Sequence, residues 1–179
     1  MADTKGRGTY AITVDPYELK NLYQLLGSFP AEYQQLVRDR AQPLSQRLAG
    51  QLMMSGLSAP APQTKLVVQS ISTPRDRLIR VDVGGSKKVG RKYGGETSKS
   101  GKGKKVRQNA APAGALLWGT EYGSHGGVDS IGRTFTNRFK TPYKKSGYWI
   151  APAVDYYVPI VAREYALMVQ QIADELRFK

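Results

Sequence analysis

Ser124 and His125 come nearest to a nucleophile and its base, because a serine hydroxyl needs a neighbouring imidazole to take its proton. They are adjacent in the segment YGSHGG. Neighbouring side chains in a glycine-rich loop do not naturally form the required hydrogen bond, and no third group is evident. His125 is the only histidine, which excludes a metal site with several histidine ligands. We interpret it as a polar loop residue.

Two glycine-rich segments approach the spacing of a phosphate-binding loop. Gly85 and Gly90 have that spacing, but Arg91 and Lys92 follow where lysine and then a hydroxyl residue are needed. The segment 95–101 is one residue too long, and Gly103 stands where the hydroxyl that would hold magnesium is needed. These departures argue against an NTPase.

The carboxylates are scattered and suggest no two-metal or paired-carboxylate chemistry. The chain has no cysteine, so thiol nucleophiles, disulfides and thiolate metal sites are excluded. We expect no enzyme, no cofactor and no bound metal. Glu121 stands out because Trp118, Tyr122 and turn glycines surround it, and we favour a structural carboxylate with its hydrogen bonds satisfied.

Positive charge is concentrated in one glycine-rich segment. The net charge is +13, and eight of these charges fall between Ser86 and Arg107, where only Glu96 opposes the basic residues. We predict a flexible basic arm over residues 84–113, from which residues 87–107 could be deleted without loss of folding but with impaired assembly. It is either a solvated linker or, as we favour, an arm that contacts a DNA backbone or an acidic partner. Its basic residues are Lys87, Lys88, Arg91, Lys92, Lys99, Lys102, Lys104, Lys105 and Arg107.

Aromatic and basic residues alternate in a second region, where Phe135 to Trp149 carries lysines and an arginine between the rings. Such a stretch could bind nucleic acid, form a partner interface or line the edge of a core. Because no second aromatic strand stands at a fixed offset, we favour the partner interface. The interface candidates are Trp118, Glu121, Tyr122, Phe135, Arg138, Phe139, Tyr143, Tyr148 and Trp149.

Apolar spacing predicts helices at both ends of the chain. One begins at Asp15 and Pro16 and ends at Gly27, and a second runs from Pro30 to about Ser55, kinked or split at Pro43. The clearest element is a C-terminal helix with Pro159 near its start. Its apolar stripe is Val154, Val158, Val161, Tyr165, Met168, Ile172 and Leu176.

Between these helices, residues 65–72 and 77–83 read as two strands of a hairpin. Residues 114–118 fit either a strand or a short helix. The fold class is therefore α+β, with a small antiparallel sheet packed against helices and a long basic Gly/Lys-rich loop. We expect a single domain, 1–179, made of helices and hairpin (10–83), basic arm (84–113), and strand or loop region with C-terminal helix (114–179). No apolar run approaches the ~20 residues that span a bilayer, so no membrane contact is predicted.

Two short segments carry a resemblance to a known family. The run from Ala115 to Ser124 (ALLWGTEYGS) follows the hairpin, and the run from Gly147 to Ala153 (GYWIAPA) opens the last helix. This order resembles the tail-completion or minor capsid group of neck proteins in long-tailed bacteriophages. The sequence departs from that family in its step into the last helix, where a Pro-Arg-Pro-Phe-like run is common, and in the length of its basic arm.

The resemblance implies a non-catalytic virion protein of the head–tail junction, present in the host cytoplasm during assembly. It implies a ring, expected to have six subunits, that contacts neighbouring neck, portal-side or tail-tube proteins while DNA passes along its axis. Whether the chain is the completion protein or the related tail terminator stays open. The alternative is a non-specific basic nucleic-acid-binding protein associated with ribosomes or the nucleoid, which high pI and small size also fit.

Overall fold

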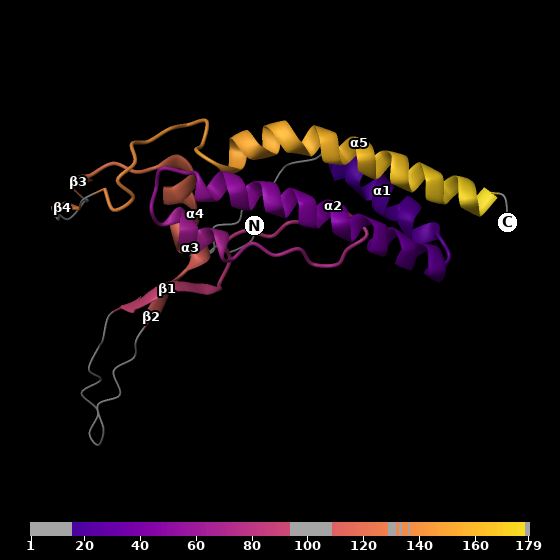
Figure 1. Ribbon diagram of the computed structural model, residues 1–179, viewed down its shortest axis with the longest axis horizontal. Helices are drawn as coiled ribbons and strands as arrows, with labels where there is room; N and C mark the ends of the chain where they lie inside the picture. The colour runs from indigo at the N-terminus through magenta and orange to yellow at the C-terminus, as the bar shows by residue number, and fades with distance from the viewer. Residues whose placement is uncertain (1–15, 94–108, 129–131, 133, 136, 178–179) are drawn as a thin grey trace, which may run out of the picture.

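The computed structural model describes residues 16–93, 109–128, 132, 134–135 and 137–177. These residues form five helices and two two-stranded antiparallel sheets (Figure 1). The expectation of a mixed fold with a small antiparallel sheet is confirmed at this level. In chain order the elements are α1 (Pro16–Ser28), α2 (Ala31–Leu57), α3 (Thr64–Val68), β1 (Lys88–Tyr93), β2 (Asn109–Pro112), α4 (Ala113–Tyr122), β3 (Gly127–Val128), β4 (Thr134–Phe135) and α5 (Ile150–Arg177).

The two long helices α2 and α5 lie side by side and run in opposite directions (Figure 1). Ion pairs join them at two levels, Arg40 to Glu175 at 3.3 Å and Arg47 to Glu164. The apolar stripe predicted on the last helix is confirmed, since five of its seven residues are buried and two are half-buried. Both helices continue through an exposed proline, so the predicted split at Pro43 is wrong. A missing N–H on a solvent-facing side interrupts little of the packing that stabilises a helix.

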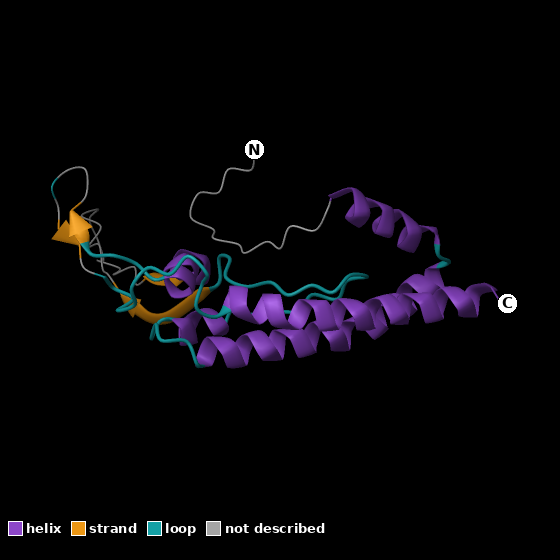
Figure 2. Ribbon diagram, turned by 90° about the horizontal axis from the view of Figure 1, so that it is seen from above, coloured by secondary structure: helices purple, strands orange, loops and turns teal. Residues whose placement is uncertain are grey.

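The core consists of two apolar clusters along this helix pair. At one end Leu26 near the end of α1, Phe29, and Val37 of α2 pack against Met168 and Ile172 of α5. At the other end α2 packs with α3, α4 and the start of α5 around Trp149. Figure 2 shows the strands gathered beyond this second end, away from the C-terminus. One end is therefore purely helical, and the other carries the loops and strands in which the interaction residues were predicted.

The predicted hairpin of residues 65–72 and 77–83 is wrong in its secondary structure. Residues Thr64–Val68 form the helix α3, because Val67, Val68 and Ile71 are buried at helical rather than alternating spacing. Residues 77–83 run beside α2 without forming a strand, and only Ser72 and Asp82 pair as an isolated β-bridge. The two segments do meet antiparallel, as expected, but side-chain hydrogen bonds replace most of the ladder.

The basic arm is structured at both of its described ends, so the prediction of a flexible segment over 84–113 is wrong there. Strand β1 pairs with β2, with Val89 opposite Ala111 and Tyr93 opposite Asn109. Val89 is buried, which anchors this ribbon to the body of the protein. Residues 114–118, for which strand and helix were both open, lie in α4. The centre of the predicted arm, 94–108, lies outside the described residues.

Candidate interaction surface

The carboxylate of Glu121 joins the end of α4 to the start of α5. It accepts hydrogen bonds from the backbone N–H groups of Trp149 (3.2 Å), Ile150 (2.7 Å) and Ala151 (2.9 Å). The first N–H groups of a helix have no partner within it, so this carboxylate caps α5 from outside. The favoured interpretation of Glu121 as a structural carboxylate is confirmed. Burial raises the pKa of Glu121 above its usual range, although these hydrogen bonds oppose the shift.

Gly147 leaves the space that this carboxylate occupies. Its φ is 72°, and a Cβ atom at this position would lie 2.0 Å from Oε1 of Glu121. Only glycine combines that backbone conformation with such a close approach. The glycine preceding Tyr148 and Trp149 is therefore part of the same unit as the glutamate in the WGTEYGS segment. The sequence pointed to Glu121 but gave no signal for Gly147 beyond its position before the helix.

Asn137 holds the loop between β4 and α5 against the end of α4. Its amide nitrogen donates to the carbonyl oxygens of Ser124 (2.6 Å) and Thr141 (2.9 Å), and its Oδ1 accepts from the Ser124 hydroxyl (2.6 Å). The backbone N–H of Lys144 also donates to the Tyr122 carbonyl at 2.8 Å. Asn137 was not predicted, because its only signal is an asparagine in a loop, where side-chain to backbone hydrogen bonds are common.

The end of α4 and the loop held in this way present aromatic rings beside positive charges. Trp118 stacks on Tyr122 with ring centroids 5.6 Å apart, and His125 lies 5.7 Å from Tyr143. Trp118 and Tyr143 are 46% and 54% exposed, which is unusual for large aromatic side chains. We define the aromatic–basic surface by its members, which are Trp118, Tyr122, His125, Arg138, Lys140, Tyr143, Lys144, Lys145 and Tyr148.

Five of the nine predicted interface residues belong to this surface, and four do not. Glu121 and Trp149 are both 0% exposed, so the structure places them inside the chain rather than at its surface. Trp149 is a core residue, and its carbonyl oxygen accepts a 2.8 Å hydrogen bond from Ser55 of α2. Phe139 is half-buried with its ring against Gly119, and Phe135 lies on β4. The aromatic residues of this region are thus divided between the core and the surface.

The basic ribbon β1–β2 forms a second charged region next to α3. Lys88 is exposed, whereas the Lys87 ammonium group donates to the Gln69 carbonyl oxygen. Arg91 and Lys92 lie on β1, so the phosphate-loop spacing around Gly90 falls on a strand and not on a turn into a helix. The other predicted contact residues lie outside the described residues. They are Lys99, Lys102, Lys104, Lys105 and Arg107.

The described residues hold no group of three or more acidic or histidine side chains that could bind a metal ion. Ser124 bonds to Asn137, while His125 lies beside Tyr143, so the structure does not pair them as nucleophile and base. Comparison with protein-family models, curated proteins and solved structures found no match. No helix in the described part of the chain is long and apolar enough to cross a membrane.

Proposed function

We propose that the protein is a structural subunit of the head–tail junction of a long-tailed bacteriophage. In this proposal it assembles as a ring, expected to have six copies, in the host cytoplasm and then in the virion. The aromatic–basic surface docks a neighbouring neck, portal-side or tail-tube protein. The basic ribbon faces DNA in the ring or an acidic partner. The family is suggested by the segments WGTEYGS and GYWIAPA, which Glu121 binds into one unit.

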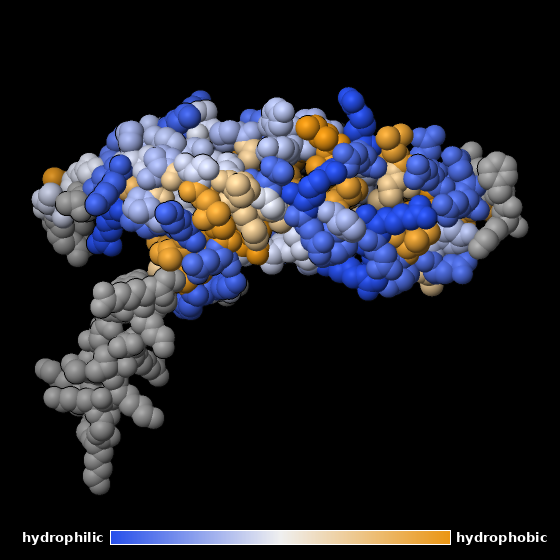
Figure 3. Space-filling view, viewed as in Figure 1, coloured by the Kyte–Doolittle hydropathy of each residue, from blue (hydrophilic) through white to orange (hydrophobic). Residues whose placement is uncertain are grey.

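The observation that carries the assembly role is a second apolar face on α5. Tyr156, Ile160 and Leu167 are 66%, 47% and 56% exposed. At 3.6 residues per turn they lie on the side opposite the buried stripe. Figure 3 shows hydrophobic side chains breaking the hydrophilic surface over α5. Exposed apolar side chains on the outer side of a helix, here beside Arg163, suit burial between subunits, and we assign this outer face to a neighbouring copy of the chain.

A pair of charge variants on α5 tests the role. Ile160→Glu places a carboxylate in the outer apolar face, and Ala166→Glu places one at an exposed position outside it. We expect the wild type and Ala166→Glu to form rings in light scattering and electron microscopy, and Ile160→Glu to remain monomeric with unchanged circular dichroism. A monomeric wild type at high concentration, or rings in both variants, would contradict the assignment.

The alternative function, non-specific nucleic-acid binding, is favoured by a different observation. Lys88, Lys140, Lys144 and Lys145 are exposed on a chain of net charge +13. A nucleic-acid binder should retard free DNA as a monomer, and its affinity should fall steeply with salt concentration. The neck protein should assemble first and bind free DNA weakly. Measuring DNA retardation with the monomeric Ile160→Glu variant separates the two functions.

A further inference from the structure

An apolar groove of about 380 Å³ opens between the helices and the segment 77–83. Leu22 of α1, Leu52 of α2 and Val158 of α5 contribute to its walls, and Ile79 and Val81 form the side along the extended segment. The lining is almost wholly apolar, and the groove is open to solvent on one side. It contacts both core clusters, so a side chain seated here would extend the core.

The extended segment beside the groove uses only one of its two backbone edges. Successive N–H groups of an extended chain point to opposite edges. On the inner edge, Arg80 donates to the Ser45 hydroxyl (3.1 Å), Asp82 to the Ser72 carbonyl (2.8 Å) and Gly84 to the Ser70 hydroxyl (2.8 Å). The intervening N–H groups make no hydrogen bond with any described residue; they belong to Ile79, Val81 and Val83.

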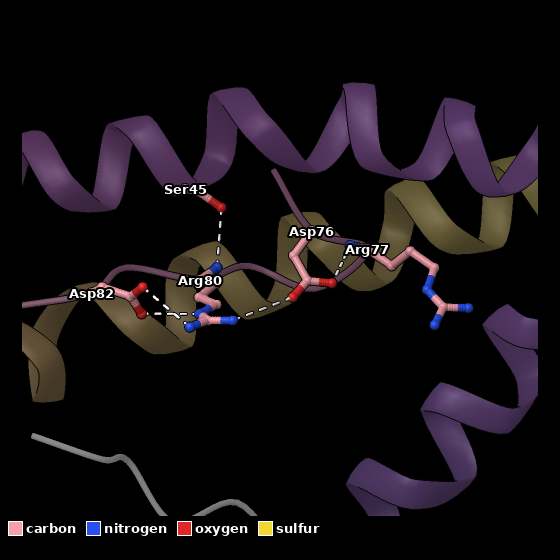
Figure 4. Close-up of polar contacts among 5 residues, drawn as sticks. All are labelled: Ser45, Asp76, Arg77, Arg80 and Asp82. Atoms are coloured by element: carbon pink, nitrogen blue, oxygen red, sulfur yellow. Dashed lines mark hydrogen bonds and ion pairs between the residues drawn. The ribbon is translucent and has the colours of Figure 1, made fainter. Parts of the chain in front are cut away.

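Side chains hold this segment in place before any partner arrives. Figure 4 shows the Arg80 guanidinium between the carboxylates of Asp76 and Asp82, and the backbone N–H of Arg80 directed at Ser45 of α2. Tyr165 of α5 also donates to the Arg77 carbonyl at 2.6 Å. The open edge of this segment is therefore already held in an extended conformation, with which another strand can pair. It fits an extended, uncharged peptide with alternating apolar side chains.

We propose that residues 9–14 of this chain, TYAITV, fill the groove as an added strand. Tyr10, Ile12 and Val14 alternate with Ala11 and Thr13, and the residue types favour strands. The segment ends just before Pro16, where α1 begins, and Leu22 of α1 already lines the groove. Six helical residues span about 9 Å and six extended residues about 20 Å. Since Leu22 lies only six residues after Pro16, the segment is long enough to reach the groove.

This docking would cover the apolar lining and give the open N–H groups their acceptors. Both effects are expected of strand addition to an exposed edge, where backbone bonds supply affinity and alternate side chains supply specificity. The proposal is independent of the role at a phage neck, since it concerns how one chain completes its own core.

Hydrogen exchange on the full chain tests the docking, with Ile12→Lys compared with Thr13→Lys. The first variant puts a charge on the face that enters the groove, and the second puts it on the opposite face. We expect protection of the Val81 amide to fall at least about tenfold in Ile12→Lys and to stay near the wild-type value in Thr13→Lys. Equal protection in all three proteins, or an equal loss in both variants, would overturn the proposal.

Cross-linking gives a second measurement that does not depend on a destabilising charge. The chain has no cysteine, so the pair Ile12→Cys and Ala162→Cys can be joined by a short bis-maleimide without background. We expect a link within one chain, at a yield well above that of the control pair Thr13→Cys and Ala162→Cys. Equal yields would overturn the docked alternation, and links only between two chains would show that a second copy supplies the strand.

Discussion

The backbone N–H of Ile150 donates a 2.7 Å hydrogen bond to the carboxylate of Glu121, which lies 29 residues earlier in the chain. Through this contact, a side chain in the last turn of α4 caps the first turn of α5. The aromatic–basic surface lies between these two points, because the loop from Asn137 to Gly147 is pinned at both ends. The contacts of Glu121, together with those of Asn137, therefore hold that surface in shape.

Replacing Glu121 by alanine should be among the most damaging single changes in the chain. Three buried or half-buried N–H groups lose their acceptor, and each such loss costs about 1–3 kcal/mol. We expect the free energy of unfolding to fall by roughly 3 kcal/mol or more. Chemical denaturation followed by circular dichroism measures this change. A loss below about 1 kcal/mol would mean that water or another group caps α5 instead.

The raised pKa of Glu121 also predicts how stability depends on pH. Because burial raises the pKa, the folded state binds a proton more readily than the unfolded state, whose carboxyl has the usual pKa of 4.5. The stability from this group is therefore fully present below 4.5 and is lost as the pH rises through the raised value. We expect the unfolding free energy of the wild type, relative to Glu121→Gln, to increase as the pH is lowered from 7. A flat difference would contradict the shift.

Gly147→Ala should destabilise the chain more than Gly85→Ala, although both glycines have a φ of 72°. At Gly85 a Cβ atom meets nothing within 4 Å, so only the cost of the left-handed conformation applies, about 1–2 kcal/mol. At Gly147 the same atom also meets Oε1 of Glu121 at 2.0 Å. We expect the difference between the two unfolding free energies to exceed about 1 kcal/mol. Equal losses would show that the carboxylate moves aside without cost.

The sequence predicted the elements whose signals are local and repeated. The apolar stripe on α5 consists of seven residues spaced three or four positions apart, so the sequence alone predicted this helix. Residues 65–72 contain only a short apolar run, from which a strand was predicted. The packing of Val67, Val68 and Ile71 against other helices stabilises the helix α3 instead. Glu121 was identified from its neighbours, but its partners in α5 are contacts between distant segments that no local pattern contains. The same limit explains why Trp149 was predicted on the surface.

The structure also changes which residues of the basic arm we expect to be removable without loss of stability. Replacing residues 94–108 by Asn-Gly would close β1 and β2 with a two-residue turn between the paired Tyr93 and Asn109. We expect this variant to melt cooperatively within a few degrees of the wild type, because a shorter loop costs less closure entropy. Deleting residues 87–107 should lower the melting temperature, since it removes the buried side chain of Val89. Similar melting curves for both deletions would show that the ribbon is not anchored.

Ser45 connects α2 to the extended segment 77–83, and its removal should loosen that segment selectively. Its hydroxyl donates to the Ala41 carbonyl (3.2 Å) and accepts from the Arg80 N–H (3.1 Å). Ser58 makes the same bond to the carbonyl four residues earlier, at 3.1 Å, but is exposed. We expect Ser45→Ala to cost about 1–2 kcal/mol and Ser58→Ala to cost less than about 0.5 kcal/mol. Hydrogen exchange at the Arg80 amide should accelerate in Ser45→Ala alone. If it does not, the segment is held mainly by the ion pairs of Arg80 and by Tyr165.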